Sequence, residues 1–531
     1  MNLLVLPILV PLFTALLVAL LNGRGMLQKV VSLGSCLWLT GFVFWLLLHV
    51  DKSGIESMCF GGWEAPFGIV FVADRLACIM LCLSMLVGTV VLVYTFWTVT
   101  DIQQKYFFYP LFQIVLLGVN WSFLSGDLFN LFVAYEVMLV GSYGMMMVGA
   151  NRGQVLQTMK YIAINTIGST LFVVGCGLLY ATVGTLNFAD LAQKTATLSG
   201  SRAGLVTAIS MVLLVVFAMK TATFPLFFWL PDSYPVVPAG VSGYFAGLLT
   251  KVGVYSLLRV FIMVFRQDGH VFSINVLLVL SGFTMLLGVL GAMCQWDIRR
   301  ILSWHIISQV GYMVMGVGLA ANPMIAEVAI AGTIFYIVHH IIVKSSLFLI
   351  GGIAERVSGT QEIRKMGGLL DMAPGVALLF IVASLSLAGM PPFSGFLCKL
   401  VLIRAGLTGG NYLIVFVALV TGFLTLYSMT KIWSYAFWRN QCHKVVGFNY
   451  RGMMAPTAIL VVMTILMGLY AQPFLSLGQR AARSVLDPQG YIAAVLGSGD
   501  EEPVADTPLE VSEPSRDPMR LVCGQPKEHR R

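Results

Sequence analysis

The chain consists almost entirely of long apolar stretches separated by short polar connections. A helix needs about 20 apolar residues to cross the hydrocarbon core of a bilayer, and on that measure we count about fourteen spans. They lie near residues 2–21, 27–49, 70–97, 106–123, 128–150, 155–183, 205–230, 239–265, 272–294, 300–320, 324–351, 375–404, 411–436 and 453–475. The pattern predicts an all-α polytopic membrane protein.

Two of these spans are interrupted by proline. Pro225 follows Lys220 by about one turn in the seventh span, and Pro391 and Pro392 precede Lys399 in the twelfth. Lipid does not tolerate the backbone groups that proline leaves unpaired unless protein or water satisfies them. Paired breaks in two halves of a transporter indicate inverted repeats around a midplane site. We therefore expect two inverted five-helix repeats with helices 7 and 12 broken, although Lys220 precedes its break whereas Lys399 follows its own.

This pattern divides the chain into five segments. They are residues 1–105 with helices 1–3, 106–265 with the first repeat, 272–436 with the second repeat, 453–475 with helix 14, and a polar C-terminal extension over 476–531. The extension is proline-rich and acidic in its middle, so we expect it to be disordered or to dock a partner.

Composition agrees with a membrane protein. Charged residues make up only 11% and hydrophobic residues 58%, whereas soluble domains carry about 25% charge. The net charge of +8 does not indicate nucleic-acid binding, because the basic residues lie in short loops beside apolar segments. Loops after odd-numbered spans carry about thirteen of them against five after even-numbered spans. The positive-inside rule then predicts a cell-membrane protein with both termini outside.

No motif for metal, nucleotide or redox chemistry is found in the sequence. The nine cysteines are scattered singly without a CxxC pair, and no GxGxxG, Walker or HExxH motif occurs. We therefore expect no metal site and no cofactor.

Five charged residues fall deep inside predicted spans: Glu136, Lys220, Lys251, Lys344 and Lys399. Each such group costs roughly 2.5–3.5 kcal/mol to insert, so five of them indicate a role in moving protons or cations. Glu136 is the only acid among them, and we expect it to pair with Lys220. The alternative is a static pair that joins two helices, but buried pairs are poor stabilisers. A switch is favoured, in which the lysine releases its proton when the glutamate is neutralised or moves away.

Further polar residues follow helical spacing near these lysines. Tyr336, His340 and Lys344 recur at steps of four, which places them on one side of the eleventh span. Histidine titrates near neutral pH, so this column suits proton relay. His339 points elsewhere, and for it a relay role and a core role are both open.

Three additional candidates lie near these groups, and two of them carry a structural alternative. His305 begins a polar stripe in the tenth span, which would equally serve hydrogen bonding between helices. Tyr255 lies one turn after Lys251 on the same face. Lys431 lies near the end of its span, where a lysine can instead extend its ammonium to the interface.

Four stretches carry a family resemblance. Lys220-Thr-Ala-Thr-Phe-Pro-Leu-Phe-Phe-Trp-Leu-Pro-Asp-Ser-Tyr-Pro, running on to Lys251, resembles the antiporter-like membrane subunits shared by respiratory complex I and Mrp-type cation/proton antiporters. The stretches Asp127-Leu-Phe-Asn-Leu-Phe-Val-Ala-Tyr-Glu136, His340-Ile-Ile-Val-Lys-Ser-Ser-Leu-Phe and Gly389-Met-Pro-Pro-Phe-Ser-Gly-Phe-Leu-Cys-Lys399 are similar to other motifs of that family. Within it, the chain is most similar to the D-type subunits of Mrp antiporters.

The resemblance implies a fold and a function. It implies fourteen helices with inverted repeats, half-channels joined by a central hydrophilic axis, and proton-transfer roles for the five buried charges. It also implies a hetero-oligomeric complex, not an enzyme, that exports Na⁺ or another monovalent cation against proton entry. One alternative is a proton-pumping subunit of an NADH–quinone oxidoreductase or membrane-bound hydrogenase complex. Another is an assembly scaffold whose lysines form only structural pairs.

Overall fold

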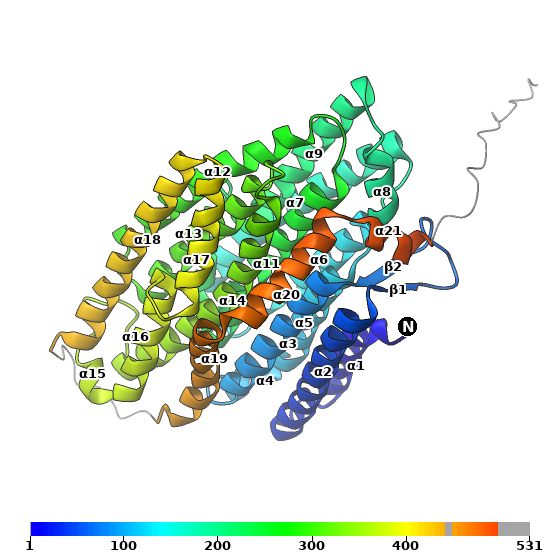
Figure 1. Cartoon of the computed structure of the whole chain (residues 1–531). Helices are drawn as coiled ribbons and strands as arrows, with labels where there is room; N and C mark the ends of the chain where they lie inside the picture. The colour runs from blue at the N-terminus through cyan, green and yellow to red at the C-terminus, as the bar shows by residue number, and fades with distance from the viewer. Residues whose placement is uncertain (1, 441–448, 498–531) are drawn as a thin grey trace, which may run out of the picture. The chain divides into compact units, whose positions relative to one another are not determined.

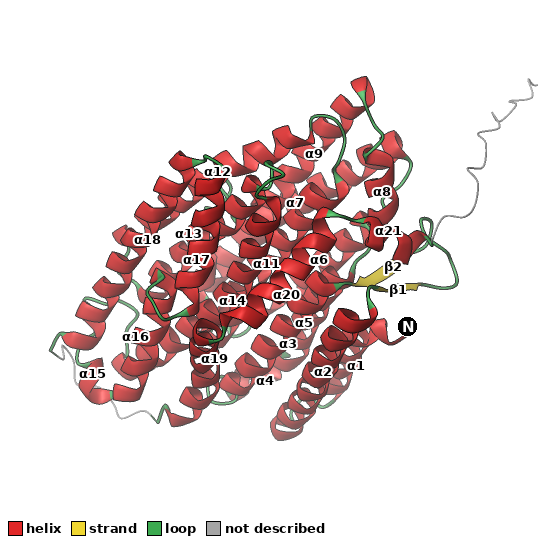
Figure 2. Ribbon diagram, viewed as in Figure 1, coloured by secondary structure: helices red, strands yellow, loops and turns green. Residues whose placement is uncertain are grey.

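The computed structural model describes residues 2–440 and 449–497, which are predominantly helical (Figures 1 and 2). The N-terminal part contains a 3₁₀ turn (Asn2–Val5), α1 (Leu6–Leu20), α2 (Gly25–Ser53), β1 (Glu56–Cys59), β2 (Val70–Ala73), α3 (Arg75–Thr95) and α4 (Asp101–Lys105). The next part contains α5 (Phe108–Leu124), α6 (Leu128–Met147), α7 (Arg152–Val183), α8 (Phe188–Thr195), α9 (Gly200–Thr221), α10 (Leu230–Ser233), a 3₁₀ turn (Tyr234–Val236) and α11 (Ala239–Leu257), which continues as a π-helix (Leu258–Val264).

The second half is also predominantly helical. It contains α12 (His270–Cys294), α13 (Ile298–Leu319), α14 (Ala326–Ser358), α15 (Leu369–Met372), α16 (Pro374–Ala388), α17 (Ser394–Thr408) and α18 (Tyr412–Ile432), which continues as a π-helix (Trp433–Trp438). Three helices follow: α19 (Arg451–Leu469), α20 (Ala471–Leu486) and α21 (Gln489–Leu496). The strands β1 and β2 form one antiparallel hairpin, in which Glu56 lies opposite Ala73.

The observed helices agree with the predicted spans. Within the described residues, twelve helices are long and apolar enough to cross a membrane, and each coincides with a predicted span. The remaining two predicted spans, 106–123 and 375–404, correspond to the shorter apolar helices α5 and α16, the latter followed by α17. The predominantly helical membrane fold is therefore confirmed, whereas the count of fourteen and the inverted repeats stay predictions.

Both predicted helix breaks are confirmed. Helix α9 ends at Thr221, and Pro225 lies in the turn between α9 and α10. Helix α16 ends at Ala388, and Pro391 and Pro392 lie in the turn before α17. Lys220 therefore occupies the last turn of α9, and Lys399 the second turn of α17.

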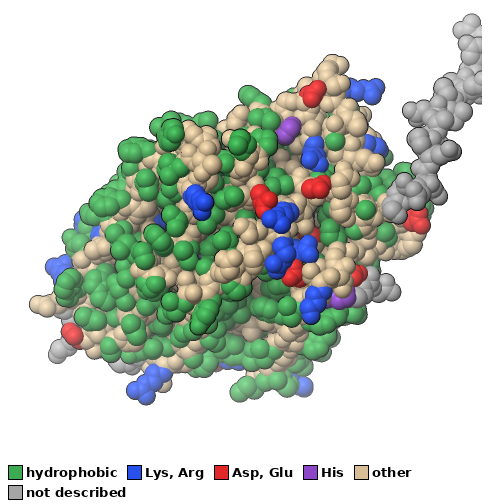
Figure 3. Space-filling view, viewed as in Figure 1, with side chains coloured by type: hydrophobic (Ala, Val, Ile, Leu, Met, Phe, Trp, Pro, Cys, Tyr) green, Lys and Arg blue, Asp and Glu red, His purple; other side chains and the backbone are tan. Residues whose placement is uncertain are grey.

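Two of the most buried helices, α11 and α14, carry the candidate lysines Lys251 and Lys344. Helices α11 and α14 lie in the middle of the bundle, with α1 and α2 on one side of them and α12 and α18 on the other (Figure 1). Every residue of α11 after Ala239 is buried. The outer helices instead expose apolar side chains, and hydrophobic side chains cover much of the face drawn in Figure 3. An apolar exterior around a polar interior is what a bilayer requires.

Of the two alternatives expected for the C-terminal extension, disorder is wrong for residues 478–496, whereas partner docking stays a prediction. These residues belong to α20 and α21, which are helical. Helix α20 buries a stripe of small side chains: Gly478, Ala481, Ala482 and Val485. Because its other face is polar, its average hydropathy is low and hides the amphipathic spacing. The rest of the extension, residues 498–531, lies outside the described residues.

Candidate functional site

The first cluster joins Glu136 on α6 to Lys220 on α9 through a serine on α7. The Ser169 hydroxyl donates a hydrogen bond to the Glu136 carboxylate and accepts one from the Lys220 ammonium at 3.3 Å. The expected pairing of Glu136 with Lys220 takes the form of a contact bridged by Ser169. The ammonium also donates to the side-chain oxygen of Asn165 at 3.4 Å.

Close packing between α7 and α9 makes this bridge possible. A Cβ atom added at Gly168 would lie 2.9 Å from the Met219 sulfur and 3.7 Å from Cε of Lys220. The absence of a side chain at Gly168 lets the backbone of α7 approach the lysine, so that a short serine side chain reaches both charges.

Lys220 also connects to α11. Its ammonium lies 5.7 Å from the centre of the Tyr135 ring, within the range of a cation–π contact. The Tyr135 hydroxyl shares a hydrogen bond of 3.0 Å with the Ser256 hydroxyl on α11. The first cluster therefore reaches the helix that carries Lys251.

The contact between α11 and α14 brings Lys251 and Lys344 onto neighbouring helices. Gly243 and Gly247 on α11 face Ser345 on α14, whose hydroxyl donates to the Gly243 carbonyl at 3.0 Å. A Cβ atom at Gly247 would lie 2.3 Å from that hydroxyl oxygen. This is the small-xxx-small packing that lets membrane helices approach closely.

Three of the buried lysines bond mainly to backbone carbonyls. Lys251 donates to the Ala246 carbonyl at 2.5 Å and to the Thr250 hydroxyl at 3.1 Å. Lys344 donates to the Leu302 carbonyl at 3.0 Å. Lys399 donates to the Leu387 and Ala388 carbonyls, at 3.0 and 2.8 Å, which end α16. The exposed carbonyls at a helix C-terminus carry partial negative charge and stabilise a cation there.

A row of rings links Lys399 to α14. The Lys399 ammonium lies 5.1 Å from the centre of the Tyr312 ring, which stacks on Tyr336 with 5.4 Å between ring centres. Tyr336 in turn stacks on His340 at 6.5 Å. The predicted column of Tyr336, His340 and Lys344 is therefore connected, through Tyr312, to Lys399 on α17, which follows the second helix break.

The histidines contribute buried ring nitrogens along this row. His340 has no hydrogen-bond partner for either nitrogen among the described side chains and backbone, and Nε2 of His305 and of His339 is likewise unpartnered. His339 shares a 2.8 Å bond with the Ser394 hydroxyl at the start of α17, so it faces the second break. His305 lies 3.5 Å from the Ser308 hydroxyl. Buried polar atoms of this kind normally bond to internal water.

Tyr255 lies in a different polar cluster from Lys251. Its hydroxyl donates to the Phe123 carbonyl at 2.7 Å and accepts from Nε of Arg259 at 3.0 Å. Arg259 forms an ion pair with Asp74, and both side chains are buried. The sequence prediction included neither charge, because each lies at the edge of its apolar stretch.

Lys431 also lies apart from the ring row. Its ammonium donates to the Met293 and Gln295 carbonyls, at 2.7 and 2.6 Å, around the C-terminus of α12, and lies 4.2 Å from the centre of the Trp296 ring. These contacts join the C-terminal ends of α12 and α18, a role that neither alternative for this residue included.

Asp127 begins the helix that carries Glu136. One carboxylate oxygen accepts the backbone N–H of Asn130 and caps α6, whereas Oδ2 is buried without a partner in the described ranges. Burial raises the pKa of Asp127 to about 6, against the opposing effect of the backbone hydrogen bonds.

The sequence prediction missed the neutral members of the first cluster. Ser169 and Asn165 carry no charge and sit four residues apart on a long apolar helix. The Gly243-x-x-x-Gly247 spacing was a usable signal for the close contact of α11. Among the described residues, no three His, Cys, Asp or Glu side chains gather as a metal site requires.

Comparison with known proteins gives consistent results. The sequence profile of the family described as NADH:quinone oxidoreductase/Mrp antiporter matches residues 125–425. The D-type subunit of the Na(+)/H(+) antiporter of Alkalihalophilus pseudofirmus is 45% identical over 497 residues, which cover 93% of this chain and 99% of that protein. The corresponding protein of Bacillus subtilis, which bears the same name, is 36% identical over 500 residues, with 93% and 99% covered.

Solved structures share the fold. A chain of the Mrp complex from Dietzia sp. superposes with a TM-score of 0.86 at 32% identity, covering 93% of this chain and 99% of that one. A chain of the archaeal membrane-bound sulfane sulfur reductase superposes with a TM-score of 0.85 at 24% identity, covering 93% of this chain and 100% of that one. The second likeness concerns the fold alone.

Proposed function

Because the chain belongs to the NADH:quinone oxidoreductase/Mrp antiporter family, we propose that it is the proton-translocating membrane subunit of a multi-subunit antiporter. The antiporter exchanges Na⁺ or another monovalent cation for protons, and the chain works in a hetero-oligomer with other antiporter subunits. Its part is transport rather than catalysis of a chemical reaction. The names of its relatives, which are D-type subunits of Na(+)/H(+) antiporters, support this assignment.

The single observation that carries the proposal is the hydrogen-bonded bridge from Glu136 through Ser169 to Lys220. An ionised Glu136 stabilises the ammonium of Lys220 across this bridge. When Glu136 is protonated or moves away, the buried ammonium loses that support and tends to release its proton. Lys220 contacts Tyr135, and Tyr135 shares a hydrogen bond with Ser256 on α11. On this proposal the released proton moves along these contacts toward α11.

The second half continues the path. Lys251 and Lys344 lie on helices that are packed through glycine, and the ring row extends from His340 to Lys399. Water at the unpartnered histidine nitrogens would connect these groups by hydrogen bonds, since buried polar sites of this kind normally hold it. Lysine exchanges its proton reversibly and needs no cofactor.

We also propose an orientation, which the distribution of the basic residues supports. Arg299, Arg300 and Arg356 gather where α13 begins and α14 ends, and Lys365 follows in the next loop. By the positive-inside rule, this end of the bundle faces the cytoplasm and both chain termini face outside. On this proposal the chain is a multi-pass subunit of the cell membrane.

The test of the proposal is Lys220→Ala in the assembled complex, reconstituted in vesicles. Removing the amine at the bridge should abolish Na⁺-dependent proton flux, measured with a pH-sensitive dye, while the complex still assembles. The matched control is Lys194→Ala, because Lys194 is exposed and pairs with Asp190 one turn away. Unchanged flux in Lys220→Ala would contradict the proposal.

The same preparation separates the alternatives. If Glu136→Gln prevents assembly instead of reducing flux, the buried charges serve as a scaffold. If the purified complex carries flavin or iron–sulfur absorbance, the chain is a pumping subunit of a redox complex.

A further inference from the structure

An arginine on α17 faces lipid without a counter-charge. Arg404 is exposed, and among the described residues its guanidinium has no hydrogen bond and no ion pair. Leu400 and Leu407 lie about one turn to either side of it on the same face of the helix and are 45% and 48% exposed. Exposed apolar side chains on both sides indicate that lipid surrounds this turn. A charge at such a position is rare and normally has a partner.

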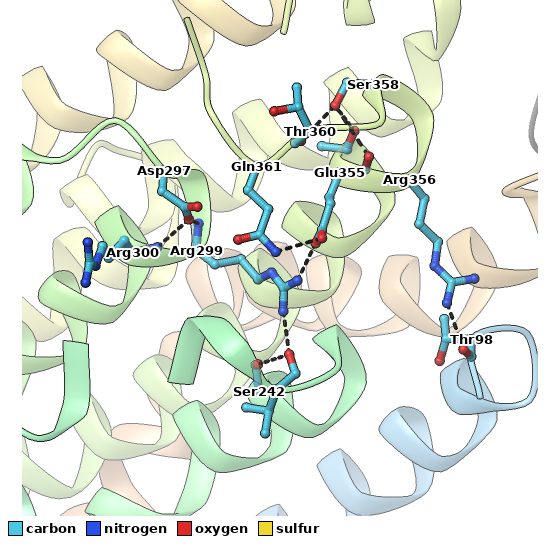
Figure 4. A network of polar contacts seen from close by, with 12 residues as sticks. Thr98, Ser242, Asp297, Arg299, Arg300, Glu355, Arg356, Ser358, Thr360 and Gln361 are labelled. Carbon is cyan, nitrogen blue, oxygen red and sulfur yellow. Dashed lines mark hydrogen bonds and ion pairs between the residues drawn. The ribbon is translucent and has the colours of Figure 1, made fainter. Parts of the chain in front are cut away.

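Arginines at the far end of α14 do have partners. Arg299 forms an ion pair of 2.5 Å with Glu355, and Arg356 donates to the Thr98 carbonyl at 2.7 Å (Figure 4). Arg404 instead lines a cavity of about 300 Å³ between α14, α17 and α20, at the end of the bundle where α14 begins. This volume lies within the size range of ligand sites.

The cavity has a polar side and an apolar side. Arg404 and Thr408 on α17 and Gln479 on α20 supply the polar groups, and none of the three has a hydrogen-bond partner within the described ranges. The apolar side is shared by the three helices and the turn before α14, and it includes Met324, Val328, Val401 and Leu475. Free hydrogen-bond donors beside an apolar wall fit an amphiphile, in which an acceptor group adjoins a hydrocarbon chain.

The charge of the cavity selects the occupant. Of the described residues that line it, none is acidic. Glu327 adjoins the lining residue Val328 in the sequence, but it pairs with Arg483 on α20 at 2.7 Å. Arg404 therefore leaves one positive charge uncompensated. A guanidinium binds a phosphate through two parallel N–H donors, whereas the ammonium of a zwitterionic headgroup would find no free carboxylate here.

We propose that this cavity binds one anionic phospholipid from the leaflet at this end of the bundle. The three polar side chains hold its phosphate, and one acyl chain lies along the apolar side. Because the lipid contacts α14, α17 and α20 together, it joins a C-terminal helix to the helix that carries Lys399. The site is independent of which ion the complex transports.

The experiment uses a phosphatidylglycerol with a photoactivatable diazirine on one acyl chain, added to the assembled and purified complex. Labelled peptides of α14, α17 and α20 are quantified by mass spectrometry. The parent should be labelled on the apolar side of the cavity. Arg404→Gln should lower this labelling about fivefold, the contribution of one basic side chain to binding at an anionic lipid surface. Arg404→Lys keeps the charge and should retain most of the labelling.

The matched control is Arg202→Gln, which should leave the labelling unchanged. Arg202 is an exposed arginine at the start of α9 and does not line the cavity. Val328→Phe narrows the apolar side without changing the charge, so it should also lower the labelling, and it is the test if Arg404→Gln does not assemble. Phosphatidylcholine with the same diazirine should label these peptides several-fold less than phosphatidylglycerol.

Four results would overturn the proposal. Equal labelling by the two lipids, or equal losses in Arg404→Gln and Arg202→Gln, would show that the cavity holds only bulk lipid. Full protection by inorganic phosphate would indicate a site for the free anion. An unlabelled parent would mean that a protein segment fills the cavity. None of these measurements uses ion flux, so their outcome is separate from that of Lys220→Ala.

Discussion

Ser169 lies between the two charges, Glu136 and Lys220, for which a proton-transfer role is proposed. A neutral hydroxyl between Glu136 and Lys220 transmits their attraction while keeping the two charged groups apart. A direct buried ion pair would be hard to separate, because each ion would lose its only partner. The bridged arrangement instead lets either group change its protonation while the hydroxyl reorients, since a hydroxyl both donates and accepts.

We predict that Ser169→Ala lowers Na⁺-dependent proton flux by about tenfold, because hydrogen bonds to charged groups contribute roughly 1.5–3 kcal/mol. Ser169→Thr keeps the hydroxyl and should restore most of the flux. Flux in reconstituted vesicles is the measurement. The control is Ser122→Ala, since Ser122 is buried but bonds to the Gly118 carbonyl of its own helix. Equal losses in the two alanine variants would contradict a specific role for Ser169.

At the scale of single elements, the first residue of interest is Asp127, whose buried carboxylate lies at the start of α6 and costs folding free energy when it is ionised. The Asp127 carboxylate caps the helix but is buried, with Oδ2 unpartnered in the described part of the chain. Its raised pKa of about 6 means that the ionised form is disfavoured in the folded protein. An acid with a raised folded-state pKa destabilises the fold at pH values above that pKa. The penalty disappears as the pH falls toward the unfolded value near about 4.

Asp127→Asn should therefore stabilise the complex at pH 8, by about 1–3 kcal/mol, and the gain should shrink between pH 6 and pH 4. Asparagine caps a helix about as well as aspartate, so the capping bond is kept. Thermal unfolding of the purified complex at pH 8 and pH 5 is the measurement. Asp101→Asn, at an exposed position, should not reproduce this pattern. A gain that is equal at both pH values would be inconsistent with titration of Asp127.

Particular elements show what the sequence could predict. The breaks after Lys220 and before Lys399 were predictable because proline acts on its own turn, whatever the tertiary structure. Helix α20 was not, because the polar residues on its other face lower its average hydropathy and hide the buried stripe of Gly478, Ala481, Ala482 and Val485. At the site, charged residues were found because charge in an apolar span is conspicuous. Ser169 was missed because a serine within a span carries no such signal.

At the scale of the molecule, α20 and α21 connect parts of the chain that are distant in sequence. Arg480 pairs with Asp51 at the end of α2, and Arg483 with Glu327 at the start of α14. These pairs are half-exposed and contribute little, about 0–1 kcal/mol each. The stronger tie is Tyr491, which is 1% exposed and lies 5.5 Å from the guanidinium of buried Arg259.

Tyr491→Ala should destabilise the complex by about 3–5 kcal/mol, as expected for removal of a fully buried aromatic side chain. The loss should appear as a lower unfolding temperature of the purified complex. Tyr470→Ala is the control, since Tyr470 is 68% exposed. If the two substitutions lower the unfolding temperature equally, Tyr491 is not an anchor of the C-terminal helices.

The carbonyl groups that hold Lys251, Lys344 and Lys399 carry one more consequence. Main-chain oxygens survive every side-chain replacement, so an alanine scan would find the three amines and none of the atoms that receive them. Replacing the amide link after Leu302 or Ala388 by an ester weakens the carbonyl oxygen as a hydrogen-bond acceptor. Such a replacement would reveal the contribution of these main-chain oxygens.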